Sequence, residues 1–330
     1  LRIVELSSVL AGPAVGMFFA ELGAEVIKIE NKTTNGDVTR KWKLKSENPE
    51  SKVSAYFSSV NYKKTYLQLD LSVEKDRKQV LELIKEADIV TTNFKAGAAE
   101  KFGLTYRDFK AVNPKIIQCQ LFGFKNDHTR PAFDAVLQAE SGFMFMNGQA
   151  ESPPTKMPVA LIDVLAAHQM KEAILLALLK RGKSGEGSYI EVSLEEAAIS
   201  ALVNQATNWL MGGKNPQRSG SLHPNIAPYG ETFQCKEGQW IVLAVGNNKQ
   251  FSTLCNCLDL SDIATDERFA NNINRVRNRE ELGKVLKAKI STVERDTLMN
   301  QFLALGVPAG AVKSMEQVFE SKTGKQMIRE

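Results

Sequence analysis

Two observations on the sequence predict an α/β fold with a parallel sheet, followed by a smaller α+β domain. The first thirty residues alternate strand, turn, helix and strand, and the alternation is repeated further along the chain. Consecutive strands joined by a helix are typical of a parallel sheet. After residues 212–216, Gly-Gly-Lys-Asn-Pro, the pattern changes to short strands followed by helices. At 330 residues the chain is long enough for one large domain and a smaller one.

The elements of the large domain follow in order. A first βαβ unit places strands at residues 3–6 and 25–29, on either side of a helix over residues 14–22 that stops at Gly23. Later strands are expected at residues 65–69, 89–92, 116–121 and 189–192, with helices at residues 73–87 and 194–210. A sheet of this kind places its ligand site at the carboxyl ends of its strands.

The second domain begins after a predicted linker. Residues 211–225 contain Gly-Gly and Asn-Pro pairs that interrupt the helical pattern, so the large domain is expected over residues 1–210. A small α+β domain is expected over residues 226–313. Its predicted strands are residues 230–234 and 239–244, and its predicted helices are residues 249–258 and 279–290.

Asp163 is the most informative single residue. It lies between a strand-like run, residues 157–162, and an apolar helix predicted over residues 164–179. The unpaired N–H groups and the dipole at a helix start favour the ionised, nucleophilic form of a carboxyl group. The other interpretation is an ordinary helix N-cap, for which Asp is well suited. Position alone leaves both open.

Composition excludes several classes of protein. The net charge of +4 is spread along the chain, which suits an anionic small ligand and disfavours nucleic acid. The longest apolar run, residues 164–179, is interrupted by polar and charged residues, so no membrane span is expected. The first residues enter a strand directly, so no signal peptide is expected and the cytoplasm is the expected location.

Common catalytic and cofactor motifs are absent from the sequence. Gly12-Pro13-Ala14-Val15-Gly16 does not match G-x-G-x-x-G, and Gly182-Lys183-Ser184 lacks the first glycine of a phosphate loop. No G-x-S-x-G is found, which disfavours a serine hydrolase. The four cysteines form no C-x-x-C pair and the three histidines are scattered, so no metal site is expected.

Several motifs together resemble one family. They are Val9-Leu10-Ala11-Gly12-Pro13, Leu22-Gly23-Ala24-Glu25-Val26-Ile27-Lys28-Ile29-Glu30, Gly36-Asp37-Val38-Thr39-Arg40, Tyr56-Phe57, Asp88-Ile89-Val90-Thr91-Thr92-Asn93-Phe94, Phe133-Asp134, Gln138-Ala139-Glu140-Ser141-Gly142, Asp163 with its helix, and Gly185-Glu186-Gly187. Their order and spacing resemble the class III coenzyme A transferases, the CaiB/BaiF family that includes formyl-CoA and carnitine CoA transferases.

The resemblance implies both architecture and chemistry. The expected architecture is a Rossmann-like large domain and a small domain in an interlocked homodimer, with residues 314–330 as the start of a segment that returns to the large domain. Asp163 matches the family's catalytic nucleophile. Asp134 matches a second carboxylate, for which the family uses Glu; a turn or capping acid is the other interpretation of Asp134.

The implied reaction moves CoA from an acyl-CoA donor to a carboxylic acid acceptor through an aspartyl anhydride/thioester intermediate. No tightly bound cofactor is expected, because coenzyme A and acyl-CoA are substrates. The residues that match CoA contacts are Leu10 and Ala11 beside the pantetheine, Arg40 near the phosphates, and Asn93 and Phe94 on the adenine side. Guanidinium groups suit phosphate oxygens, although Arg40 could also be a solvated surface charge.

Two other functions remain open at this point. Alpha-methylacyl-CoA racemases share the implied fold but need a proton-exchanging residue before the acid at position 134, where this chain has Phe133. A CoA-binding protein without catalysis is the second alternative. Leu10 stands where formyl-CoA transferase has glutamine, so a formyl or oxalate specialist is not expected.

Overall fold

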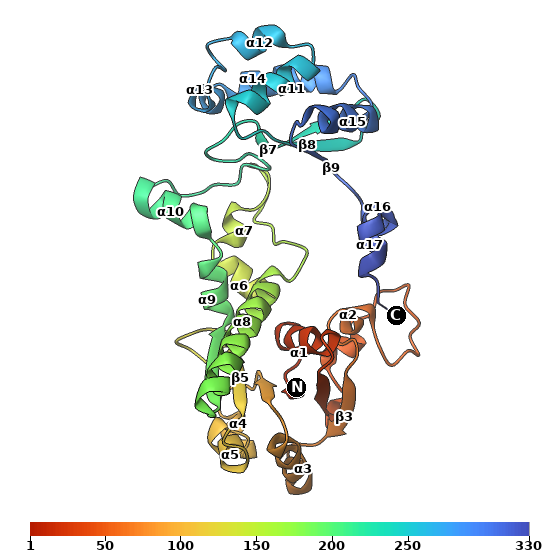
Figure 1. Ribbon diagram of the computed structural model, residues 1–330, viewed down its shortest axis with the longest axis vertical. Coiled ribbons are helices and arrows are strands. Elements are labelled where there is room, and N and C mark those ends of the chain that lie inside the picture. Colours follow the sequence, from red (N-terminus) through yellow and green to blue (C-terminus); the bar gives the residue numbers. More distant parts are fainter. Residues whose placement is uncertain (330) are drawn as a thin grey trace. The chain divides into compact units, whose positions relative to one another are not determined.

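The computed structural model describes residues 1–329, which form two compact units (Figure 1). The large unit comprises Leu1–Gly148 and Ser152–Gln217, and the small unit comprises Gln149–Glu151 and the chain from Arg218 onward. The boundary between Gln217 and Arg218 falls inside the linker predicted at residues 211–225.

The large unit is built on a six-stranded parallel sheet in the order β3-β2-β1-β4-β5-β6. Its strands are β1 (Arg2–Leu6), β2 (Glu25–Asn31), β3 (Thr65–Leu69), β4 (Ile89–Thr92), β5 (Ile117–Phe122) and β6 (Ser188–Ser193). Strands β2 and β3 are added on one side of β1 and strands β4, β5 and β6 on the other, as in doubly wound nucleotide-binding folds. The predicted α/β fold with a parallel sheet is confirmed.

Helices cover both faces of this sheet. Those of the large unit are α1 (Ala11–Glu21), α2 (Ala55–Ser58), α3 (Glu74–Lys85), α4 (Ala98–Phe102), α5 (Tyr106–Val112), α6 (Asp134–Glu140), α7 (Phe143–Met146), α8 (Leu161–Ser184), α9 (Leu194–Ser200) and α10 (Val203–Gly212), with short 3₁₀ turns at Lys32–Thr34 and Val38–Lys41. Alternate strand residues point to opposite faces. Ile3 therefore packs in a core with α1, α8 and α9, while its neighbour Val4 packs in a second core with α3 and α5.

The small unit has a three-stranded antiparallel sheet in the order β7-β8-β9. Its elements are β7 (Tyr229–Gln234), β8 (Trp240–Ala244), α11 (Asn248–Cys257), α12 (Ser261–Thr265), α13 (Asn272–Arg277), α14 (Arg279–Ile290), α15 (Arg295–Leu305), β9 (Ala309–Ala311), α16 (Met315–Glu320) and α17 (Lys322–Met327). Arg275 is fully buried in this unit, where its guanidinium donates to the carbonyls of Ala227 and Phe269 and lies over the Phe251 ring.

Two predicted elements are wrong. Residues 157–160 form no strand, and α8 already begins at Leu161. Pro158 has no N–H to donate to a sheet, which explains why this run pairs with no strand. The helix predicted over residues 194–210 is divided into α9 and α10, and Val203 at the start of α10 has a φ of 38°. Within the described residues, no helix combines the length and the apolar character that a membrane span requires.

Candidate active site

Two buried carboxylates from different helices lie at the start of α8. Asp163 is the third residue of α8, whose N-cap position is Ala160, so Asp163 does not cap its own helix. Asp134, the first residue of α6, supplies that cap instead. Its Oδ1 accepts hydrogen bonds from the backbone N–H groups of Ile162 at 2.7 Å and Asp163 at 3.4 Å. The cap holds Asp134 close to Asp163, and both residues are 9% exposed.

Burial and charge make Asp163 unusual. Removal of the carboxyl group from water, and secondly the negative charge of Asp134, raise the pKa of Asp163 to about 7. A carboxyl group with this pKa is half ionised at neutral pH and holds its charge in a poorly solvated site. Such a group is a stronger nucleophile than an exposed aspartate.

Gln138 fixes the position of Asp134. Its side-chain amide is fully buried, donates to Asp134 Oδ2 at 2.6 Å and accepts from the backbone N–H of Met157 at 2.8 Å. Gln138 lies four residues after Asp134 on the same face of α6. Sequence reasoning assigned Gln138 no role, although it belongs to one of the motifs that carried the resemblance.

Tyr56 is a further polar group near the pair. Partial burial, and then the charges of Asp163, Asp134 and Asp37, raise the pKa of this phenol. Tyr56 therefore remains a neutral O–H donor at neutral pH. Its ring lies edge-on to Trp42, with the ring centroids 5.0 Å apart. Tyr56 was not among the predicted site residues, because a tyrosine in a short helix carries no chemical pattern of its own.

The start of α1 shares a core with the start of α8. Leu10 occupies the N-cap position of α1 and makes no side-chain cap hydrogen bond. Ala11 is buried in the same core cluster as Ile162 and Ala166 of α8. The first N–H groups of a helix have no partner within the helix. Leu10 and Ala11 thus place uncapped donors at the end of the sheet where α8 also begins.

A pocket of about 640 Å³ lies at the carboxyl ends of β1, β2, β3 and β4. Asn93 and Phe94 line it, as do Lys95 and Lys101, and neither lysine forms a salt bridge with another described residue. This is the switch point of the sheet, where doubly wound folds bind nucleotides. Glu30, Asp37 and Asp70 also line the pocket, but Glu30 is paired with Arg40 and Asp37 with Lys28. The size and the two lysines therefore suit an anionic ligand.

Arg40 is not among the residues that line this pocket. Its Nε donates to Glu30 at 3.0 Å, and its guanidinium lies 3.7 Å from the centroid of the Phe57 ring. The Arg40 Nη1 also donates to the carbonyl of Lys52. These contacts use Nε and Nη1 of Arg40, and its predicted contact with the CoA phosphates stays a prediction.

Comparison of the chain with known proteins identifies its family. The model of CoA-transferase family III matches residues 1–327. The chain belongs to CoA-transferase family III. A succinate–glutarate CoA-transferase of Agrobacterium fabrum is 36% identical over 327 residues, which cover 97% of this chain and 80% of that protein. A human succinyl-CoA:glutarate CoA-transferase is 34% identical, over 97% of this chain and 72% of that protein.

Solved structures of the family have the same fold. A CaiB/BaiF family protein from Brucella suis superposes with a TM-score of 0.85 at 37% identity, covering 99% of this chain and 86% of that one. A protein from Mycobacterium tuberculosis superposes with a TM-score of 0.86 at 27% identity. The resemblance stated from the motifs is confirmed, and with it the assignment of this family III member as a CoA transferase.

Proposed function

We propose that Asp163 is the nucleophile with which this enzyme moves CoA from an acyl-CoA donor to a carboxylic acid acceptor. The observation that supports this role is the buried pair of carboxyl groups, in which Asp163 has a pKa of about 7 and Asp134 caps its helix. A merely structural aspartate at a helix start would accept the helix N–H groups itself. Asp163 leaves that task to Asp134.

In the first half-reaction the ionised Asp163 attacks the carbonyl carbon of the thioester. The C–S bond breaks, CoA leaves as its thiolate, and a mixed anhydride joins the acyl group to Asp163. The thiolate then attacks the side-chain carbonyl carbon of Asp163. The donor acid leaves as a carboxylate, and CoA is held as an aspartyl thioester.

In the second half-reaction the acceptor carboxylate attacks the aspartyl thioester and again releases the thiolate. The thiolate attacks the acyl carbonyl of the new anhydride, which gives the acceptor's CoA thioester and regenerates the Asp163 carboxylate. No proton is gained or lost over the cycle. Each tetrahedral intermediate carries an oxyanion that must be stabilised by donors already in place.

Three groups are suited to assist these steps. The negative charge of Asp134 destabilises ionised Asp163, and this repulsion is reduced when the charge passes from Asp163 to the oxyanion of the tetrahedral intermediate. The O–H of Tyr56 and the uncapped N–H groups at the start of α1 are neutral donors for the oxyanion. The repulsion acts on the ground state and the donors act on the transition state, so both lower the barrier.

We assign the nucleotide part of CoA to the pocket at the carboxyl ends of β1–β4. Asn93 and Phe94 line it on the side of β4, and the ammonium groups of Lys95 and Lys101 can neutralise phosphate charge. Leu10 and Ala11 then lie on the way from this pocket to Asp163, beside the pantetheine. The acids named for the relatives, succinate and glutarate, favour testing short dicarboxylates first.

The test compares Asp163→Ala and Asp163→Asn with the wild-type enzyme. We expect exchange between succinyl-CoA and a panel of dicarboxylates to fall at least about a thousand-fold, because no other nucleophile replaces the carboxylate. CoA affinity, measured by calorimetry, should change by less than about three-fold, since the nucleotide pocket is untouched.

Chemical trapping identifies the residue that becomes acylated. Hydroxylamine added during turnover should convert Asp163 to its hydroxamate, which peptide mass spectrometry locates. The Asp163→Asn variant is the negative control. Substantial exchange in either variant, or a label on a cysteine, would contradict the proposed nucleophile.

A further inference from the structure

The turn that joins β1 to α1 contains a strained residue. Val9 has a φ of +74°, a left-handed conformation that a β-branched side chain disfavours. Such a residue costs on the order of 1–3 kcal/mol and persists only where its surroundings hold it. The next two residues are Leu10 and Ala11, at the start of α1.

Side chains from other elements hold three consecutive residues of this turn. Lys28 Nζ donates to the Ser7 carbonyl at 2.8 Å. Asn93 accepts from the Ser8 N–H at 3.1 Å and donates to the Ser8 carbonyl at 3.0 Å. Asp37 Oδ2 accepts from the Val9 N–H at 3.2 Å. The last of these contacts falls on the strained residue itself.

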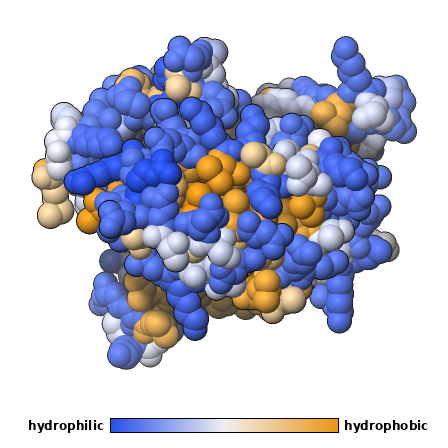
Figure 2. Space-filling view, turned by 90° about the horizontal axis from the view of Figure 1, so that it is seen from above, coloured by the Kyte–Doolittle hydropathy of each residue, from blue (hydrophilic) through white to orange (hydrophobic). Residues whose placement is uncertain are grey.

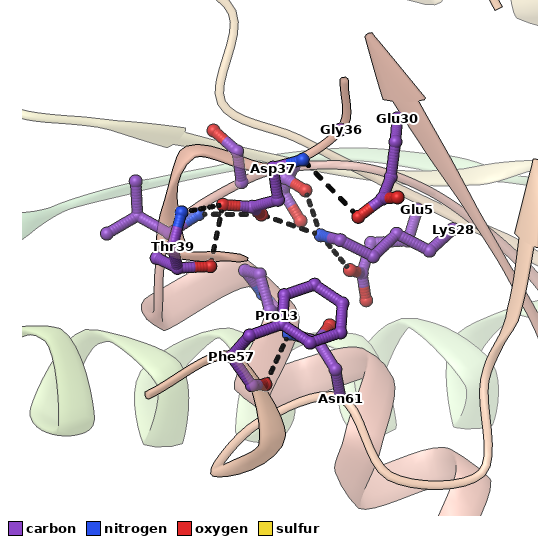
Figure 3. Close-up of polar contacts among 12 residues, drawn as sticks. Glu5, Pro13, Lys28, Glu30, Gly36, Asp37, Thr39, Phe57 and Asn61 are labelled. Atoms are coloured by element: carbon purple, nitrogen blue, oxygen red, sulfur yellow. Dashed lines mark hydrogen bonds and ion pairs between the residues drawn. The ribbon is translucent and has the colours of Figure 1, made fainter. Parts of the chain in front are cut away.

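Asp37 is in turn fixed from both sides, as Figure 3 shows. Its Oδ1 accepts from the N–H and the hydroxyl of Thr39 at 3.0 and 2.8 Å, and its Oδ2 lies 3.1 Å from Lys28 Nζ. The Asp37 side chain is only 1% exposed. Lys28 also pairs with Glu5 at 2.9 Å, so the charge of Lys28 is shared between two buried acids.

The charge state of Asp37 agrees with this geometry. Burial alone would raise the pKa of Asp37, but the positive charge of Lys28 and the hydrogen bonds from Thr39 outweigh burial and leave the pKa below its usual value. Asp37 therefore stays ionised at neutral pH and remains a strong acceptor for the Val9 N–H.

We propose that Asp37 is a positioning residue that holds the strained Val9 turn, so that the first N–H groups of α1 face the acyl group carried by Asp163. This inference rests on the proposed function. Asp37 also lines the proposed nucleotide pocket, but its carboxylate oxygens are taken by Thr39, Lys28 and Val9, and its effect on the donors acts through Val9. Its loss should loosen the donors of the oxyanion site while the nucleotide pocket keeps its other contacts.

The principal variant is Asp37→Asn, which keeps the shape of the side chain and removes its charge. We expect kcat to fall about 10- to 100-fold, the size of effect that a small misplacement of catalytic groups produces. Because Asp37 also lines the nucleotide pocket and the change removes a negative charge there, CoA binding should not weaken, and the Kd for CoA is measured beside kcat. Amide deuterium uptake of a peptide covering residues 6–12 should increase, because the Val9 N–H loses its ionised acceptor.

A matched control is available at the opposite end of the sheet. Asp88 also accepts a backbone N–H, from Arg2 at 2.8 Å, and also pairs with a basic side chain, Arg181 at 2.8 Å. Asp88→Asn makes the same chemical change at a site remote from the turn. We expect kcat and the deuterium uptake of residues 6–12 to remain those of the wild type.

Two further variants separate positioning from general stability. Thr39→Val removes one hydrogen bond to Asp37 with little change in volume and keeps the test usable if Asp37→Asn does not fold. We expect a smaller fall in kcat in the same direction. Val9→Gly relieves the strain, because glycine adopts positive φ without cost. In that background the loss of kcat caused by Asp37→Asn should shrink at least about five-fold.

The results distinguish failure of this inference from failure of the proposed function. The inference is overturned by unchanged deuterium uptake at residues 6–12, by increased uptake with unchanged kcat, or by an equal fall in kcat with and without Val9→Gly. If the wild type exchanges no CoA at all, the proposed function fails instead. Deuterium uptake then decides by itself whether Asp37 holds the turn.

Discussion

At the residue scale, Asp163 shows how an acid at a helix start can have a raised pKa. An aspartate in the first turn of a helix usually accepts the free N–H groups, which stabilises its charge and makes it inert. Here Asp134 accepts the N–H groups of Ile162 and Asp163, so the Asp163 carboxylate sits beside a second negative charge. Because Asp134 caps α8 in place of Asp163, its charge lies close to Asp163 and contributes to the raised pKa of Asp163.

The pH dependence of the reaction follows from this arrangement. Attack requires ionised Asp163, so kcat/KM for the acyl-CoA should rise with pH through a midpoint near the pKa of about 7. In Asp134→Asn the neighbouring charge is lost, and the midpoint should move to lower pH. Asp134 uses one oxygen for the Ile162 N–H and the other for the Gln138 amide, whereas Asn has a single acceptor oxygen, so thermal unfolding of the variant is measured as well. A pH–rate profile of both proteins checks the direction, and an unchanged or higher midpoint in the variant would contradict the repulsion.

At the element scale, the close approach of α1 to β1 depends on glycine. A Cβ at Gly16 would collide with Oε2 of Glu5, which is fully buried and pairs with Lys28 and Lys64. Lys64 donates to Glu5 at 2.8 Å and also to the Pro13 carbonyl of α1 at 2.8 Å. Helix α1 therefore packs directly against the ion pairs of Glu5 with Lys28 and Lys64, and position 16 has no room for a methyl group.

We expect Gly16→Ala to lower the free energy of unfolding by about 2–3 kcal/mol, because the methyl group must displace a buried, paired carboxylate. The matched control is Gly182→Ala in α8, where an added Cβ meets no atom within 4 Å. Alanine is the better helix former, so this control should gain about 0.5–1 kcal/mol. Urea denaturation of both variants measures the difference, and shifts of the same sign would show that the collision is absent.

Elements of regular period could be predicted from the sequence, and contacts between distant residues could not. The buried strands 3–6 and 89–92 and the long apolar helix after Asp163 carry strong local patterns, and all are found. The run at 157–162 has a strand-like composition, but Pro158 and the lack of a partner strand decide against it. The cap from Asp134 to α8 spans 28 residues, and no local pattern encodes it.

The same limit applies to the turn before α1. The motif containing Val9 and the motif containing Asp37 were both visible in the sequence, but nothing local showed that one holds the other. Arg40 is a further case. Its motif suggested a phosphate contact, which stays a prediction, but nothing local showed that its guanidinium also pairs with Glu30 and lies over Phe57.

At the scale of the whole molecule, large apolar side chains are exposed on the surface of the chain. The view in Figure 2 shows a mainly hydrophilic face with hydrophobic residues gathered near its middle. On α8, α9 and α10 several large apolar side chains are strongly exposed: Leu176, Leu179, Ile199, Leu210 and Met211. Met211 is 87% exposed. Single exposed apolar residues are normal on monomers, whereas large contiguous apolar patches mark interaction surfaces.

Exposed apolar side chains of this kind suit a subunit interface, and the interlocked homodimer remains a proposal for this chain. Sedimentation velocity should give a mass of twice 36.5 kDa. In an interlocked dimer each chain would thread through the other, so the subunits would separate only on unfolding. This mass should then not fall when the protein is diluted from micromolar to nanomolar concentration, in contrast to an ordinary reversible dimer. Leu210→Glu with Met211→Glu should hinder assembly, because both carboxylates would be buried unpaired. The control variant Lys183→Glu with Ser184→Glu, at two exposed residues of α8, should leave the mass unchanged. A monomer at all concentrations would contradict the dimer, and a mass that falls on dilution would contradict the threading.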